Sequence, residues 1–167
     1  MAVLLARTPA EAHVYMDLHP CACGSSVFER MSSVVADGDD LHSVYRGTCE
    51  GCGKAREVRF RLPEQPIFTG GALRFGDEQP SELLDPGEWL ALADAHATRE
   101  PATRGDVQIA AAAIEEILKF GPADAEHIPE AAFTSERGRT VRAAEPGRFR
   151  RARLEAVLAA YRSIVAS

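Results

Sequence analysis

Apolar and polar positions along the chain follow two different periods. Residues 26–36 and 41–48 are rich in residues that favour strands, and residues 57–62 alternate polar and apolar side chains, which is typical of a half-buried strand. Residues 37–40, Asp-Gly-Asp-Asp, form a turn signal between the first two segments. The N-terminal part is therefore predicted to hold three strands, two of them joined as a hairpin.

Helical signals lie on both sides of this strand region. Residues 8–11, Thr-Pro-Ala-Glu, combine a capping residue, a first-turn proline and an acidic residue, so a short helix is predicted to run to about Asp17. Residues 85–88, Asp-Pro-Gly-Glu, repeat that signal, and apolar residues then recur at helical spacing. The later predicted helices span residues 87–98, residues 103–118, residues 135–144 and a last stretch that follows Pro146-Gly147.

These elements predict an α+β protein in three parts. Residues 1–65 hold the short N-terminal helix and a three-stranded antiparallel β unit, residues 66–86 form a connecting loop, and residues 87–167 form a helical region of about four helices. Each helix has an apolar stripe that must be buried. We therefore expect the helical region to pack on the β unit as one compact body.

The charges are unevenly distributed. The net charge of −6 argues against a general affinity for nucleic acid or acidic membranes, but residues 137–167 carry +6 and residues 1–136 carry −12. Two charged clusters are candidate partner-binding surfaces, although such an acidic run is more often a turn, and a solvated or internally paired helix face is the commoner explanation of the basic cluster. They are Asp37, Asp39 and Asp40 on the predicted hairpin tip, and Arg148, Arg150, Arg151 and Arg153 at the start of the last helix.

All four cysteines of the chain lie in two close pairs. Cys21 and Cys23 form one pair, Cys49 and Cys52 form the other, and a glycine follows each pair. Paired thiolates closed by glycine are what a tetrahedral Zn²⁺ ion needs. A redox dithiol at the second pair would need a helix-forming context around it, whereas the flanking residues favour strands.

Each cysteine pair with its glycine forms a knuckle, a short turn that presents two thiols. Residues 18–62 resemble the zinc-ribbon family in their order of elements: knuckle, strand, turn, strand, knuckle, strand. The second knuckle, residues 49–53, matches the CxxCG form of that family, whereas the first is one residue shorter. The resemblance implies one structural Zn²⁺ clasped by both knuckles, in a closed site without an open position for substrate. Two ligand sets stay open: the four cysteines, or a set in which His19 replaces Cys21.

The chain offers no recognisable catalytic set. No Ser-His-Asp or Cys-His arrangement can be assembled, the glycines lack phosphate-loop spacing, and Glu115 and Glu116 are expected to face solvent. We therefore expect a non-enzymatic, zinc-stabilised protein–protein interaction module, such as an adaptor or an inhibitor or immunity protein of a basic partner. The alternative is a nucleic-acid-binding or transcription-associated zinc ribbon that uses the Arg-rich last helix.

The location expected from the sequence is cytoplasmic. No apolar run approaches the roughly 20 residues of a membrane span, and the N-terminus is too short and interrupted for a signal peptide. A reducing compartment favours metal thiolates over disulfides. The pattern is typical of a small bacterial-type protein that does not bind membranes.

Overall fold

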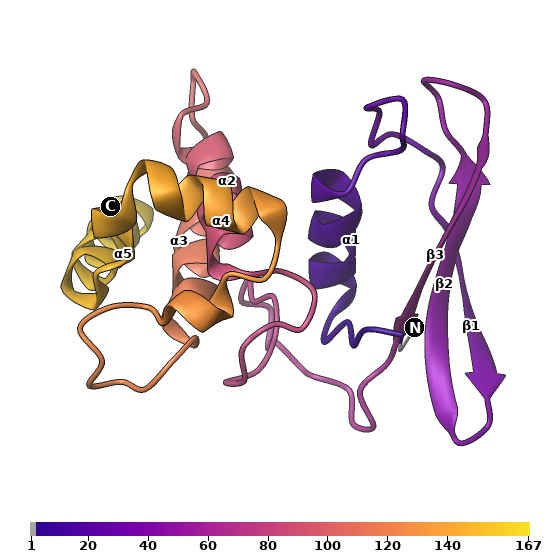
Figure 1. The fold of residues 1–167 in the computed structure, drawn as a ribbon, viewed down its shortest axis with the longest axis horizontal. Helices are drawn as coiled ribbons and strands as arrows, with labels where there is room; N and C mark the ends of the chain where they lie inside the picture. Colours follow the sequence, from indigo (N-terminus) through magenta and orange to yellow (C-terminus); the bar gives the residue numbers. More distant parts are fainter. Residues whose placement is uncertain (1–2) are drawn as a thin grey trace. The chain divides into compact units, whose positions relative to one another are not determined.

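The computed structural model describes residues 3–167, and the chain forms two compact units, Met1–Phe68 (unit 1) and Thr69–Ser167 (unit 2). Figure 1 traces the chain from the helix and strands of unit 1 to the helices of unit 2. The predicted α+β class and the three-stranded antiparallel sheet are confirmed. The described residues hold five α-helices, one before the sheet and four after it.

The sheet of unit 1 has the order β1-β2-β3 and is antiparallel throughout. Its strands are β1 (Met31–Asp37), β2 (Asp40–Thr48) and β3 (Ala55–Arg61). Asp37 pairs with Asp40, so the hairpin closes with a two-residue loop that starts at Gly38, whose φ is +62°. A glycine with positive φ at this position is typical of the tight turns whose twist matches that of the strands.

The first strand begins later than the sequence pattern predicts. Residues 26–36 were expected to be extended, but β1 starts only at Met31. Arg30 has a φ of 52°, in the left-handed region, which interrupts the extended backbone. Phe28, ahead of this break, forms an isolated antiparallel bridge with Cys49 instead. The break therefore redirects this segment from the hairpin towards the cysteines.

Helix α1 (Pro9–Leu18) packs on one face of the sheet. Thr8 caps it by accepting a hydrogen bond from the N–H of Glu11 at 3.1 Å, as the sequence signal indicated. The Tyr15 ring meets the ring of Phe60 on β3 edge-on, with the two centroids 5.4 Å apart. Unit 1 thus has a small apolar core between α1 and the strands β2 and β3, to which β1 adds no buried residue.

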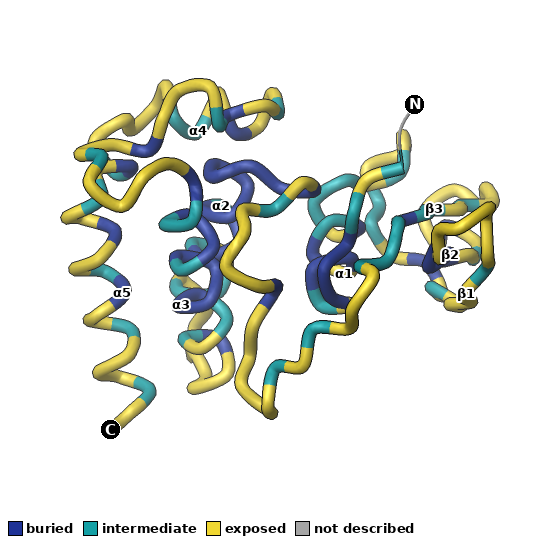
Figure 2. The backbone as a smooth tube through the Cα atoms, turned by 90° about the horizontal axis from the view of Figure 1, so that it is seen from below, coloured by how far each residue is buried: buried dark blue, intermediate teal, exposed yellow. Residues whose placement is uncertain are grey.

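Unit 2 is helical, with its core along the two central helices. Trp89 on the first helix and Ile114 and Ile117 on the second are almost completely buried, and Figure 2 shows these two helices as the main buried segments. The elements are α2 (Pro86–Ala97), α3 (Arg104–Leu118), η1 (Glu130–Ala132), α4 (Glu136–Ala144), η2 (Pro146–Phe149) and α5 (Arg151–Ala166). None of the helices in the described part of the chain is long and apolar enough to cross a membrane.

A buried carboxylate joins two helix starts in unit 2. Asp85 caps α2 by accepting from the N–H groups of Gly87 and Glu88, both at 3.0 Å, within the predicted capping box. Its other oxygen accepts from the N–H and the hydroxyl of Ser135, the cap of α4, both at 2.8 Å. A Cβ at Gly138 would clash with the Asp85 carboxylate. The absence of a side chain at Gly138 therefore lets the starts of α2 and α4 approach the same Asp85 carboxylate.

Two residues of unit 2 are buried although the sequence pattern did not predict it. Residues 66–85 contain neither helix nor strand, yet Phe75 in this loop is buried with its ring centroid 4.9 Å from that of Trp89. Glu116 was expected to face solvent, but it is only 1% exposed and accepts from the Lys119 ammonium at 2.5 Å. A paired lysine one turn later makes burial of this carboxylate possible.

Candidate metal centre

The second cysteine knuckle is a tight backbone turn. The N–H of Gly53 donates to the carbonyl of Cys49 at 2.8 Å, and the N–H of Cys49 donates to the carbonyl of Lys54 at 2.9 Å. Gly53 has a φ of +71°, which glycine adopts at no steric cost. The glycine after the pair is therefore required by the backbone of the turn.

The first knuckle repeats this turn with one residue fewer. The N–H of Gly24 donates to the carbonyl of Cys21 at 2.8 Å, and the N–H of Cys21 donates to the carbonyl of Ser25 at 2.9 Å. Gly24 has a φ of +90°, again in the region that favours glycine. The CxC spacing thus shortens the turn without changing its two-bond pattern.

The two knuckles bring the four sulfur atoms together. The Sγ atoms of the four cysteines all lie within 4.8 Å of one another. The Cys21–Cys52 pair is 3.7 Å apart and the Cys23–Cys49 pair is 3.6 Å apart, and all four cysteines are free. Tetrahedral coordination with metal–sulfur bonds of about 2.3 Å requires sulfur–sulfur distances of about 3.8 Å. The group therefore has the size of a four-thiolate metal site.

His19 lies outside this group of ligand atoms. Its Nδ1–H donates to the carbonyl of Tyr15 at 2.9 Å, and the two rings stack with centroids 4.0 Å apart. These contacts hold the imidazole at the end of α1. The geometry thus brings together the four-cysteine set rather than the set in which His19 replaces Cys21.

The electrostatics of the cluster favour a cation. Burial raises the pKa of Cys49, but the N–H groups of Gly51 and Cys52 outweigh it and lower that pKa to about 6. The N–H of Lys54 lowers the pKa of Cys52, but burial and the neighbouring thiols outweigh it and raise that pKa to about 11. The Cys49 thiolate is thus favoured, the neighbouring thiols oppose ionisation of Cys52, and a bound cation would favour both thiolates.

Gly51 is a site residue that the sequence pattern did not single out. A Cβ at this position would come within 3.1 Å of the Cys23 sulfur and 2.8 Å of the Ser25 Cβ. Side chains of the first knuckle thus occupy the space that a side chain at position 51 would need. The only signal in the sequence is a second glycine inside the CxxCG motif.

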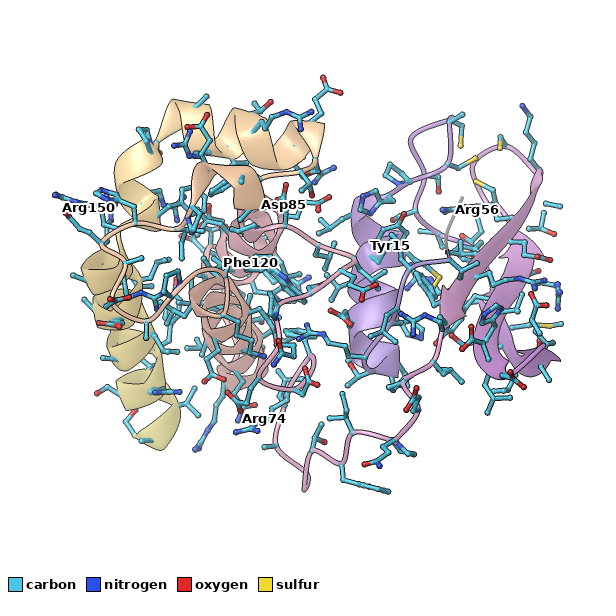
Figure 3. The ribbon with its side chains drawn as sticks, turned by 60° about the horizontal axis from the view of Figure 1, so that its bottom comes forward. Tyr15, Arg56, Arg74, Asp85, Phe120 and Arg150 are labelled. Atoms are coloured by element: carbon cyan, nitrogen blue, oxygen red, sulfur yellow. The ribbon has the colours of Figure 1, made fainter. Side chains whose placement is uncertain are left out.

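An aromatic ring with two arginines, Phe28 with Arg30 and Arg56, lies next to the cysteine cluster. Two guanidinium groups lie over the ring of Phe28, which bridges to Cys49: the Arg56 Cζ is 4.6 Å and the Arg30 Cζ is 5.4 Å from the ring centroid. Arg56, labelled in Figure 3, also donates to the carbonyl of His19 at 2.9 Å. This arginine therefore ties β3 to the end of α1, and no sequence motif indicated that role.

The acidic cluster lies at the other end of the sheet from the cysteines. Figure 1 shows both knuckles at one end of unit 1 and the β1–β2 hairpin at the opposite end. Asp37, Asp39 and Asp40 are all exposed on this hairpin. The Asp37 carboxylate is 3.9 Å from the Nδ1 atom of the buried His42. The structure therefore does not bring the acidic residues to the metal centre.

Arg148, in the basic cluster, forms an ion pair inside unit 2. It makes a two-pronged ion pair with Asp94 of α2, at 2.7 and 2.6 Å, and this carboxylate raises its pKa. Arg150 pairs with Glu126 at 2.9 Å. Both contacts link the segment before α5 to earlier parts of the helical unit.

Arg151 binds backbone carbonyls instead of carboxylates. Its guanidinium donates to the carbonyls of Leu118, Pro122 and Ala125 at 3.2, 3.0 and 3.2 Å. It thus closes the end of α3 and the loop that follows. Arg153 is exposed, and no hydrogen bond or ion pair of its side chain is found among residues 3–167.

Comparison of the chain with protein-family models, with curated proteins and with solved structures finds no match in any of the three.

Proposed function

We propose that Cys21, Cys23, Cys49 and Cys52 bind one structural Zn²⁺ ion. The convergence of the four sulfurs within 4.8 Å carries this proposal. Four thiolates in tetrahedral arrangement are the donor set of structural zinc sites, as in the zinc-ribbon family. The backbone N–H groups aimed at these sulfurs supply the second layer of contacts that such sites use.

This site supports a structural rather than a catalytic role for the metal. With four protein ligands the ion has no open position for water or substrate. We therefore propose that the chain is a non-enzymatic, zinc-stabilised protein–protein interaction module, located in the cytoplasm, whose acidic hairpin suits a basic partner. An adaptor or an inhibitor of a basic protein, such as an immunity protein, fits this description.

The contacts of the arginine cluster favour a protein partner over nucleic acid. Arg148 and Arg150 pair with carboxylates of unit 2, and Arg151 binds three carbonyls. Guanidinium groups engaged in this way are less available to neutralise phosphates, the contacts that dominate nucleic-acid affinity.

Metal analysis with two ligand variants tests the zinc site. We expect one zinc per chain in protein purified under reducing conditions, and a four-thiolate charge-transfer absorption after exchange with Co²⁺. Cys21→Ser should lose both signals and His19→Ala should keep both. The opposite pattern would move the ligand to His19, and a wild-type protein without metal would overturn the proposal.

Affinity capture from a lysate of the source cells tests the interaction role. The zinc-loaded protein is expected to retain specific proteins that Cys49→Ser does not retain, because only the folded sheet presents the hairpin. Double-stranded DNA and RNA at low salt are the competing probes. Tight, salt-sensitive binding of either one, with no protein captured, would favour the nucleic-acid alternative.

A further inference from the structure

The outer edge of β3 is paired at its last residue, whereas the outer edge of β1 is unpaired along its whole length within residues 3–167. At the outer edge of β3, the N–H of Arg61 donates to the carbonyl of Leu4 at 2.9 Å, and the N–H of Ala6 donates to the carbonyl of Arg61 at 3.0 Å. No segment of residues 3–167 pairs with the outer edge of β1. An unpaired edge presents a row of backbone donors and acceptors to any extended chain.

Residues 31–36 of β1 lack the usual protection of an edge strand. Residues 31–36, Met-Ser-Ser-Val-Val-Ala, contain no charged residue and no proline. Met31 is 71% exposed and Val34 is 62% exposed. Natural edge strands are commonly protected by charges, proline or bulges, so an uncharged edge with exposed Met31 and Val34 indicates a binding surface.

A groove of about 380 Å³ runs beside this edge, between α1 and the strands β1 and β2. Ser32 and Val34 line it from β1, since they pair with Tyr45 and Ser43 on the face that α1 covers. His13 forms part of the α1 wall, and burial followed by the charge of Arg30 lowers its pKa, which favours the neutral imidazole. The groove is therefore uncharged and of side-chain size.

The negative charge at one end of the groove favours a bound segment with a basic residue. Asp37, Asp39 and Asp40 lie exposed where β1 ends, and no basic residue pairs with these carboxylates among the described residues apart from the 3.9 Å approach of His42. A chain that is antiparallel to β1 starts at this end. A Lys or Arg near its N-terminal end would face the three carboxylates.

We propose that β1 and this groove bind an extended segment of a partner protein as an antiparallel fourth strand. The segment carries a Lys or Arg at the end that faces the acidic hairpin, followed by aliphatic side chains at alternate positions, one of which enters the groove. Antiparallel addition continues the pattern of the existing sheet. The inference rests on the proposed function and names the chemistry of its partner.

Selection from a phage-displayed library of random peptides on the zinc-loaded full chain tests the proposal. We expect a consensus of a basic residue followed by alternating aliphatic residues. In synthetic copies, N-methylation of one alternate set of backbone amides should abolish binding, whereas methylation of the other set should have little effect, because successive N–H groups of a strand point to opposite sides.

Charge variants of the chain locate the binding surface. Val34→Lys is expected to weaken the selected peptides by at least about tenfold, or about 1.4 kcal/mol. Asp37→Asn together with Asp40→Asn should reduce both the affinity and its salt dependence. Ile164→Lys is the matched control, because Ile164 is 54% exposed on α5 and should leave binding unchanged. Far-UV circular dichroism verifies that each variant is folded.

Four results would overturn the proposal. These are the selection of no peptide, a consensus without the basic residue, binding that Val34→Lys leaves unchanged, and a homodimer in sedimentation that Val34→Lys disperses. The last result would assign the edge to a second copy of the chain. The proposed function has separate tests, since a zinc-containing protein that captures a partner through another surface would retain that function while this inference fails.

Discussion

The two units of this chain are stabilised in different ways. Among the described residues, unit 1 has nine buried apolar residues in 66 positions, whereas unit 2 has nineteen in 99. Unit 1 has four thiols at one end of its sheet, and unit 2 has a buried carboxylate between two helix starts. On the proposed function, the small β unit relies on a metal where the helical unit uses apolar packing and polar capping.

Removal of the metal gives the largest expected difference between the units. Structural zinc contributes on the order of 10 kcal/mol of coupled binding and folding, more than a core of this size supplies. Chelation or Cys49→Ser should therefore unfold unit 1 and leave unit 2 folded. Amide NMR spectra measure this directly. The signals of residues 31–61 should lose their chemical-shift dispersion, and those of the α2–α5 helices should stay unchanged. Simultaneous loss of both sets would contradict the comparison.

The reciprocal experiment alters the carboxylate clamp of unit 2, which is the Asp85 side chain together with the starts of α2 and α4 that it caps. Gly138→Ala forces a methyl group against Asp85 and should cost about 2–3 kcal/mol in the free energy of unfolding of unit 2. Gly147→Ala is the matched control, since a Cβ there meets no atom within 4 Å, and should be neutral or slightly stabilising. Chemical denaturation measures both.

Zinc content distinguishes the clamp from a general effect on the chain. It should stay at one ion per chain in Gly138→Ala, because the clamp lies in unit 2 and the cysteines lie in unit 1. A drop in zinc content would show that the units do not fold independently.

A smaller effect is expected from the contact between the two knuckles. Gly51→Ala places a methyl group against the Cys23 sulfur and should lower zinc affinity by roughly 10–100-fold, the range found for residues that support metal ligands. Glu50→Ala, at the exposed neighbouring position, is the control and should leave the affinity unchanged. Competition with a chromogenic chelator measures both variants. Equal zinc affinities of the two variants would show that the close contact between the knuckles does not support the metal site.

The smallest effect is a pH dependence confined to unit 2. Hydrogen bonds from Thr103, and then from His96, hold the pKa of Asp106 well below its usual value of about 3.9. A lowered folded-state pKa adds stability above the unfolded pKa, and this stability is lost as the pH falls through the folded pKa. Asp106→Asn should therefore lower the melting temperature of unit 2 at pH 7 more than at pH 3, and an equal decrease at both pH values would contradict this.

Local signals predicted much of the fold because they act over a few residues. The capping box at Asp85 and Glu88, the turn at Gly38 and the two cysteine pairs each specify their own backbone. What the sequence did not reveal depends on contacts between distant segments. Arg56 meets the carbonyl of His19, and Arg151 meets three carbonyls far from it in the chain.

The candidate site shows the same division. The four cysteines were predicted as one cluster from their spacing, but the need for Gly51 follows only once the first knuckle lies against the second. The uncovered edge of β1 was equally hidden, since an alternating pattern shows that a segment is a strand but not which strand lies beside it.

A zinc titration of the chelated protein, followed by amide NMR, tests the central claim most directly. The account predicts that the amides of residues 31–61 recover completely at one equivalent of Zn²⁺, while those of unit 2 do not change. An unfolded unit 1 after zinc addition, or a unit 1 that stays folded throughout without zinc, would contradict it.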